Sequence, residues 1–446
     1  MSFRKALRRL SVLAGAVGVL GASLSGCGGG GGGGGNSGGN PGGGGGTGTG
    51  RSVCQMNPHQ TGRARWTVLI YMNAANNLQP DSLTNMAQIL SVGSDANLNI
   101  VVQWKQANCA DCGNPTFVGT RRYLVHRGDF TTLDQDRLPD PATNVNGTSD
   151  MGDWHVLQNF VQWGYQNFPA DHLAVVIWDH GSGWEPTRSA GNRLKLRFRA
   201  VSQDDEFNTE IETEQIPQAL AGVPVDTLIF DASLEQMVEV AYQVRNSAHV
   251  MIGSEESPPG EGYPYDAWLG ALKSSSGVLN PCQVGEEIVR DFVAAYPNNS
   301  NITQSVVDLT KMDNVATALN NFANTLRLHI HDQADLLSNA RERAQNYAYP
   351  ENKDLFDYAE ILRTSTASPI DIKQAAANME TALINGSSGA VITSSHGNID
   401  QTGSHGLAIY IPGFDIAGQP LYLSAYNNLA LARSTNWDEF LQAQVK

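Results

Sequence analysis

The sequence predicts an α/β protein with a mostly parallel central sheet flanked by helices, together with a C-terminal extension. Strand-like apolar runs alternate with segments of helical spacing from Arg65 onward. The runs are almost continuously apolar and rich in β-branched residues, as expected of strands that are covered on both faces. Of the 446 residues, 41% are hydrophobic and 16% are charged, so the chain is a folded protein long enough to bury a large core.

Each element follows from its local pattern. "WTVLIYMNA" at 66–74 is the first continuous apolar run, and "HLAVVIWDHGSGW" at 172–184 is a strand that ends in a glycine-rich turn. Further strands are predicted over 98–104, 121–127, 225–231 and 250–255, and helices over 81–92, 154–168, 209–220 and 235–246. We expect the later elements to extend the same sheet or to pack beside it: a strand over 302–309, helices over 311–345, and apolar runs at 389–395 and 406–412.

The first 63 residues are predicted to lie outside the fold. Residues 1–26 combine a basic start with a short apolar stretch and end in Leu-Ser-Gly before Cys27, which resembles the lipobox of bacterial lipoproteins. Glycine occupies 17 of the 23 positions in 28–50, so 27–63 is expected to be a flexible linker, and a flexible stretch of about 26 residues has an end-to-end distance of about 25–30 Å. The sequence therefore predicts an exported protein of the bacterial cell envelope, anchored through lipid on Cys27 at the periplasmic face or cell surface.

Charge and cysteine content narrow the function further. The formal net charge is −15, which argues against nucleic-acid binding, since that depends on clustered Lys and Arg. Four cysteines remain besides Cys27, and an oxidising exterior permits three disulfide pairings among Cys54, Cys109, Cys112 and Cys282. The spacing of Cys109 and Cys112 suits half a zinc site, a redox pair or a small loop disulfide. Without a second metal-binding pair we favour the disulfide and expect no metal there.

Two successive predicted strands end in groups that can carry chemistry. One strand ends in Asp179-His180-Gly181 and the next in Asp231-Ala232-Ser233. Because ligands of open parallel sheets bind beyond the carboxyl ends of the strands, we expect the imidazole and the hydroxyl to meet at one edge. Backbone N–H groups at such places can bind a developing oxyanion.

These residues carry a resemblance to a known family. The chain resembles the clostripain-related cysteine peptidases, relatives of the caspase, legumain and gingipain group, in which one strand ends in His-Gly and the next in Asp-Ala-Cys. The resemblance continues through "WTVLIYMNAANNL" (66–78), "GSEESPPGEGYPYDAWL" (253–269), "LFDYAEIL" (355–362) and "GLAIYIP" (406–412). It implies a caspase-like three-layer sandwich over 64–446, with a core at about 64–310 and a C-terminal part at about 311–446. It also implies peptide or protein substrates.

The family's functional residues map onto this sequence one at a time. His180 corresponds to the catalytic histidine, and the N–H of Gly181 to an oxyanion donor. Asp231 corresponds to the acid of a pocket for Arg or Lys side chains, and Glu261 stands where the family places a second pocket acid. The nucleophile position is occupied by Ser233 instead of cysteine.

The serine leaves three functions open. A thiol is partly ionised near neutral pH and intrinsically nucleophilic, whereas a hydroxyl needs an oriented general base. The leading interpretation is therefore a lipid-anchored peptidase homologue, catalytically impaired, that keeps the acidic pocket. The alternatives are an active endopeptidase that cleaves after Arg or Lys through residue 233 and His180, and a non-enzymatic envelope binding or scaffold lipoprotein. Ser233 also has a purely structural interpretation, because Ser233 and Gln236 have the spacing of a helix capping box.

Two charged segments lie between these two predicted strands. Arg188, Arg193, Lys195, Arg197 and Arg199 form a basic loop, and the resemblance implies that such a loop is cut during maturation. The resemblance also raises calcium as a candidate ligand of the acidic run at 204–206, although its spacing is not that of an EF-hand. No other cofactor is expected.

Overall fold

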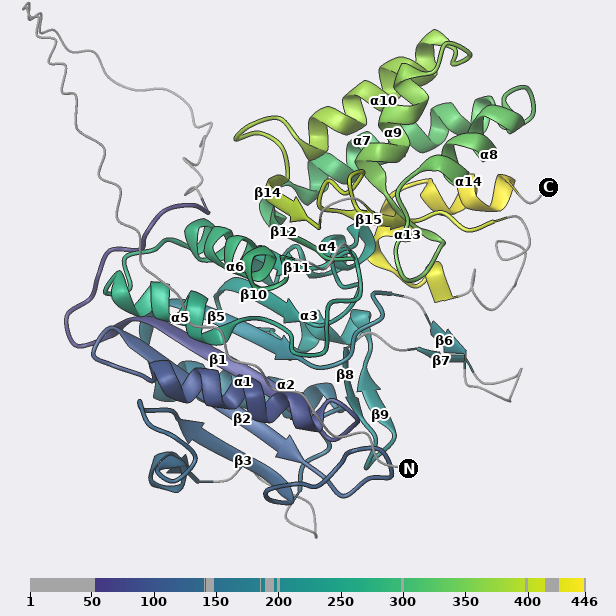
Figure 1. Cartoon of the computed structure of the whole chain (residues 1–446). Coiled ribbons are helices and arrows are strands. Elements are labelled where there is room, and N and C mark those ends of the chain that lie inside the picture. Colours follow the sequence, from purple (N-terminus) through teal and green to yellow (C-terminus); the bar gives the residue numbers. More distant parts are fainter. Residues whose placement is uncertain are drawn as a thin grey trace, which may run out of the picture. The chain divides into compact units, whose positions relative to one another are not determined.

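The computed structural model describes residues 53–139, 141, 148–184, 186–188, 196–198, 201–297, 301–397, 400–413 and 425–444 (Figure 1). The chain divides into two units, Met1–Gly50 and Arg51–Lys446, and the described residues belong to the second. The expected signal peptide, Cys27, the glycine-rich stretch and most of the basic loop lie outside the described residues. None of the described helices is both long and apolar enough to cross a bilayer.

A nine-stranded sheet forms the centre of the second unit, and its strand order is β14-β12-β11-β10-β5-β1-β2-β3-β4. The strands are β1 (Ala64–Ala74), β2 (Leu98–Gln106), β3 (Gly119–Leu124), β4 (Arg137–Leu138), β5 (Ala170–Trp178), β10 (Val225–Asp231), β11 (Ala248–Gly253), β12 (Thr303–Asp308) and β14 (Val391–His396). The five central strands run parallel, and the strands at both edges are antiparallel. The predicted α/β sandwich with a mostly parallel core is confirmed.

Helices cover both faces of this sheet, and the side chains of β1 show why. Val68 and Ile70 belong to one apolar cluster, whereas Leu69 and Tyr71 belong to the other. Successive residues of a strand point to opposite faces, so a continuous apolar run feeds two cores. The first face packs α1 (Gln79–Val92), α5 (Tyr265–Ser274) and α6 (Pro281–Ala295). The second packs α2 (Trp154–Asn167), α4 (Val238–Val244), α7 (Met312–Leu328), α9 (Leu355–Thr364) and α10 (Ile370–Leu383).

The C-terminal part contributes to the sheet and also builds beside it. The run at 389–395 contains most of β14, which pairs with β12 and extends the main sheet. The run at 406–412 contains β15 (Ala408–Tyr410), which pairs with β13 (Asn352–Asp354) in a separate two-stranded sheet. The helices expected over 311–345 are α7 and α8 (Ala334–Arg343).

Two predicted helices are wrong over part of their length. In the segment 209–220, β9 (Thr209–Ile211) pairs with β8 (Val201–Asp204), and only α3 (Ile216–Ala219) is α-helical. The segment 235–246 becomes helical only at Val238. In both cases hydrogen bonds to neighbouring strands replace those of a first helical turn, as shown below for Gln236.

Both disulfides are formed, and the small loop disulfide favoured from the sequence is one of them. Cys109 pairs with Cys112, and Cys54 pairs with Cys282, 228 residues away in the sequence. The second bridge ties the segment before β1 to the first turn of α6. Asn57 attaches the same segment to β5, because its backbone N–H donates to Nε2 of His172 at 2.8 Å.

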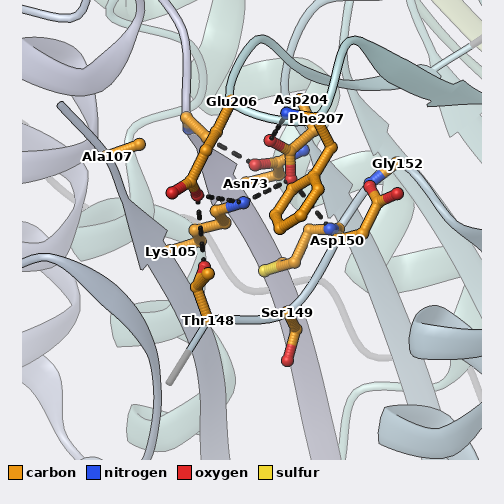
Figure 2. A network of polar contacts seen from close by, with 12 residues as sticks. Asn73, Lys105, Ala107, Thr148, Ser149, Asp150, Gly152, Asp204, Glu206 and Phe207 are labelled. Carbon is orange, nitrogen blue, oxygen red and sulfur yellow. Dashed lines mark hydrogen bonds and ion pairs between the residues drawn. The ribbon is translucent and has the colours of Figure 1, made fainter. Parts of the chain in front are cut away.

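A buried ion pair attaches the β8–β9 hairpin to the sheet (Figure 2). The ammonium of Lys105, at the carboxyl end of β2, lies 2.6 Å from Oδ2 of Asp204 and 2.9 Å from Oε2 of Glu206. Lys105 and Asp204 are fully buried. Two of the three carboxylates in the run 204–206 are thus bound to an ammonium group, which leaves less negative charge for a cation. Calcium at this run stays a prediction. Among the described residues no cluster of His, Cys, Asp and Glu suits a metal.

The two disulfides are expected to differ in their contribution to stability. Replacing Cys54 and Cys282 with serine should lower the free energy of unfolding by about 5 kcal/mol, and replacing Cys109 and Cys112 by about 2 kcal/mol, because the longer loop loses more entropy in the unfolded chain. Urea unfolding of the two double variants measures both values. Equal losses would contradict this loop-length argument.

The Lys105 ion pair is expected to be essential and pH-dependent. Lys105→Met leaves two carboxylates without their cation and should cost about 3–5 kcal/mol at neutral pH. Burial already raises the pKa of Asp204, so lowering the pH protonates it early, and the loss should shrink on acidification. The control is Asp313→Asn, which breaks the exposed pair with Arg245 and should cost at most about 1 kcal/mol. Unfolding at pH 7 and pH 4.5 measures both effects, and a loss that grows on acidification would refute the assignment.

Candidate active site

The site lies at the carboxyl edge of the two central strands β5 and β10. Their register places Trp178 opposite Asp231, and the N–H of Asp179 donates to the carbonyl of Asp231 at 3.2 Å. The loops that follow both strands therefore leave the sheet side by side. A cavity of about 220 Å³ opens between them. Its lining consists of Leu78, Trp178, Asp179, His180, Asp231, Ala232, Ser233, Ser257, Pro258, Pro259, Gly260 and Gly262.

His180 is partly exposed at this cavity and is held by an amide. Its Nε2 lies 2.7 Å from Oδ1 of Asn77, in the segment that follows β1. An amide oxygen only accepts, so Nε2 donates its proton, and this tautomer leaves the lone pair of a neutral imidazole on Nδ1. Asn77 was not identified from the sequence. Its position just after a central strand, where segments reach the same edge, is the signal that would have pointed to it.

Asp179 holds the backbone of the histidine loop. It is buried, and its Oδ1 accepts the N–H of His180 and the side-chain amide of Asn76, each at 2.6 Å. Burial raises the pKa of Asp179 well above its ordinary value, against the opposing effect of these two hydrogen bonds. The carbonyl of His180 accepts from the N–H of Ser202 at 3.3 Å, so the β8–β9 hairpin also supports this loop.

Ser233 lies on the tight turn between β10 and α4. Leu234 has a φ of +65°, a left-handed conformation that is uncommon for a residue with a side chain. Within the described residues the hydroxyl of Ser233 is hydrogen-bonded to the hydroxyl of Ser257, at 2.9 Å, rather than to the imidazole. Ser257, which follows β11, is a second residue that the sequence analysis missed.

The capping-box interpretation of Ser233 is wrong. The residue that precedes α4 is Met237, four positions further on. Gln236 donates its backbone N–H to the carbonyl of Ser254 at 3.1 Å and its side-chain amide to Oγ of Ser305 at 2.8 Å. Its side chain is therefore bound to β12 and cannot close a capping box. Tertiary hydrogen bonds override the local pattern here.

Gly181 is in direct contact with the turn that carries Ser233. A Cβ at Gly181 would lie 2.4 Å from the carbonyl oxygen of Ser233 and 2.7 Å from Oε1 of Glu235. Real Cβ atoms do not approach so closely, so only glycine fits between the two loops. The structure brings Gly181 beside residue 233, and its role as an oxyanion donor stays a prediction.

Asp231 supplies a buried carboxyl group to the same cavity. Its Oδ2 accepts the hydroxyl of Tyr265 at 2.9 Å and the N–H of Tyr263 at 3.3 Å. Burial raises the pKa of Asp231 to about 7, although both hydrogen bonds oppose the shift. Gly262 passes so close that its Cβ would lie 2.7 Å from Oδ1 of Asp231.

Glu261, the expected second pocket acid, is exposed, and its neighbours Gly260 and Gly262 line the cavity in its place. A further carboxyl group comes from Asp81 in the first turn of α1. Oδ2 of Asp81 lies 3.1 Å from the place of a Cβ on Gly260. Burial raises the pKa of Asp81, and the negative charge of Glu261 raises it further. The pocket roles of Glu261 and Asp231 stay predictions, and Asp81 is a candidate that the sequence analysis did not name.

Comparisons with known proteins show which family the chain belongs to. The clostripain of Hathewaya histolytica is 28% identical over 233 residues, which cover 48% of this chain and 43% of that protein. The chain thus matches less than half the length of this curated relative.

Two solved structures share the fold. The inactive zymogen C11 protease of Parabacteroides distasonis has a TM-score of 0.60 at 20% identity, covering 84% of this chain and 99% of that one. The secreted C11 cysteine protease of Bacteroides thetaiotaomicron, in complex with an irreversible peptide inhibitor, has a TM-score of 0.60 at 21% identity, covering 84% and 100%. A sequence model of the clostripain family matches residues 70–443, and the chain belongs to the clostripain family of peptidases.

Proposed function

We propose that the protein is an exported, lipid-anchored peptidase homologue whose turnover is impaired by Ser233 and which retains an acidic pocket for Arg or Lys side chains. The observation that carries the proposal is the contact of Ser233. Its hydroxyl is hydrogen-bonded to Ser257 at 2.9 Å, although His180 lines the same cavity.

The chemistry of the nucleophile supports impairment. A serine becomes nucleophilic when a base takes its proton, and that base must lie within hydrogen-bond reach and be oriented by a third group. Asn77 orients the imidazole, but the hydroxyl of Ser233 is paired with another hydroxyl, which is no base. A cysteine at the same place would be partly ionised without that help. The surroundings therefore suit a thiol better than a hydroxyl.

The acidic pocket supports recognition of a basic side chain. Asp231 lines the small cavity, and Asp81 lies beside its wall at Gly260. When ionised, these carboxylates attract a basic group. The walls at Trp178, Pro258 and Pro259 can pack the aliphatic part of Arg or Lys. The relative named clostripain belongs to the same family, for which we infer a matching preference. Lipidation of Cys27 is supported by the lipobox-like sequence and export by the relative described as secreted.

The impairment is tested on four proteins: the wild type, Ser233→Cys, Ser233→Ala and, as a matched control, Ser257→Cys. On Arg- and Lys-ending fluorogenic peptides, Ser233→Cys should exceed the wild type by roughly 10²–10⁴-fold in kcat/KM, the share that a general base supplies. Ser257→Cys puts a thiol in the same cavity off the turn and should gain nothing.

The other outcomes identify the alternatives. Wild-type turnover that Ser233→Ala abolishes would establish an active serine endopeptidase and overturn the impairment. If none of the four proteins turns over these peptides and none binds basic peptides, the scaffold function remains.

Binding of a basic peptide should depend on the ionisation of Asp231. With a pKa of about 7, Asp231 is mostly neutral at pH 5.5 and mostly charged at pH 8.5. The affinity of the wild type for an Arg-ending peptide should therefore rise as the pH rises through 7, and calorimetry at both pH values measures it. Asp231→Asn should bind weakly at both. A wild-type affinity that falls with pH would exclude Asp231 from the pocket.

A further inference from the structure

Glu235 links the two loops of the site. It lies two residues after Ser233 and is fully buried. Its Oε1 accepts the backbone N–H of Ser182 at 3.2 Å and of Gly183 at 3.1 Å. Those two residues directly follow Gly181. One carboxyl oxygen of the turn after β10 therefore fixes the loop after β5.

The loops meet backbone to backbone around this carboxyl group. A Cβ at Gly181 would touch both Oε1 of Glu235 and the carbonyl of Ser233. A Cβ at Gly183 would lie 2.6 Å from Sδ of Met237 and 2.8 Å from the carbonyl of Leu234. Because no side chain fits at either glycine, the spacing of the loops is set by the hydrogen bonds across them, and Glu235 accepts two of these.

The carboxyl group of Glu235 is bound to the loop through one oxygen. Burial raises its pKa well above the ordinary value, although the hydrogen bonds from Gly183 and Ser182 oppose the shift. Oε1 can accept both N–H groups whether the carboxyl group is neutral or ionised. Among the described residues Oε2 has no hydrogen-bond partner, so the contact to the loop depends on one oxygen.

We propose that Glu235 is the positioning residue of the oxyanion site, which holds the N–H of Gly181 at a fixed place relative to the side chain of residue 233. An oxyanion donor works when it lies about 2.7–3.1 Å from the developing charge, and a tolerance of about 0.5 Å separates good sites from poor ones. The catalytic part of this inference rests on the proposed function. The structural part, the fixing of 181–183 by Glu235, does not.

Glu239 offers a matched control. It is also fully buried, lies on α4, and accepts the N–H of Tyr410 at 3.0 Å and the hydroxyl of Tyr426 at 2.8 Å. Burial raises its pKa to about 7. Its hydrogen bonds go to the C-terminal part and not to the 181–183 amides, although the rings of Tyr410 and Tyr426 pack against Trp184. Its removal therefore tests the loss of a nearby buried acid that does not bind these amides.

The first test is amide hydrogen exchange on the full-length protein with Ser233 in place. Glu235→Met should speed exchange of the amides in 181–183 by about tenfold or more, because Ser182 and Gly183 lose their hydrogen-bond acceptor. Glu235→Gln keeps an acceptor oxygen and should leave exchange near the wild-type rate, and Glu239→Met should do the same for this segment. Glu235→Asp shortens the side chain by one methylene and should also speed exchange of these amides. It takes the place of Glu235→Met if the Met variant does not fold.

Unchanged exchange in the Met and Asp variants would overturn the proposal, as would equal acceleration by Glu239→Met. This test needs no activity. If Ser233→Cys lacks turnover, the proposed function fails while the exchange result still decides the role of Glu235.

The second test uses the Ser233→Cys background. Glu235→Met should lower kcat by about 10²-fold, the effect of losing one oxyanion donor, with KM within about threefold. Glu235→Gln should restore kcat to within about fivefold. A rise in KM at unchanged kcat, or failure of the Gln variant to restore activity despite a folded protein, would overturn the positioning role.

Discussion

The parallel pairing of β5 with β10 is the constraint on which the whole site depends. Neighbouring strands lie about 4.8 Å apart, and the register sets Trp178 against Asp231. The segments that follow β5 and β10 therefore leave the sheet at the same level, with almost no space between them. That closeness excludes a side chain at position 181, brings His180 and Ser233 to one cavity, and leaves the loops to bond with each other instead of with water.

Buried carboxyl groups satisfy the backbone that this closeness removes from solvent. Asp179 accepts the N–H of His180, and Glu235 accepts those of Ser182 and Gly183 across the loops. Asp231 accepts the N–H of Tyr263 and the hydroxyl of Tyr265. Burial raises the pKa of Asp179 and Glu235 well above their ordinary values and that of Asp231 to about 7, so Asp231 changes its charge near neutral pH. The carboxylates of Asp204 and Glu206 are bound by the ammonium group of Lys105 and not by backbone N–H groups alone.

Family membership and activity are separate questions for this chain. The chain belongs to the clostripain family, whereas the role of Ser233 at the nucleophile position is a prediction from the resemblance of its surroundings to that family. Fold-level likeness cannot decide turnover, because chemistry depends on the groups in the site. What matters is whether the hydroxyl of Ser233 meets a base, and its partner is the hydroxyl of Ser257.

The sequence by itself determined the α/β class, the central strands and the meeting of His180 with Ser233 at one edge, because continuous apolar runs and the order of strand ends are local properties of the chain. Only the tertiary structure decided which side chains form hydrogen bonds and ion pairs with one another. Gln236 binds β12 instead of capping a helix, the acidic run at 204–206 binds Lys105, and Asn77, Asp81, Ser257 and Glu235 reach the site from four different segments. Hydrogen bonds and ion pairs between distant segments leave no periodicity in the sequence, since they form only once the sheet has brought those segments together.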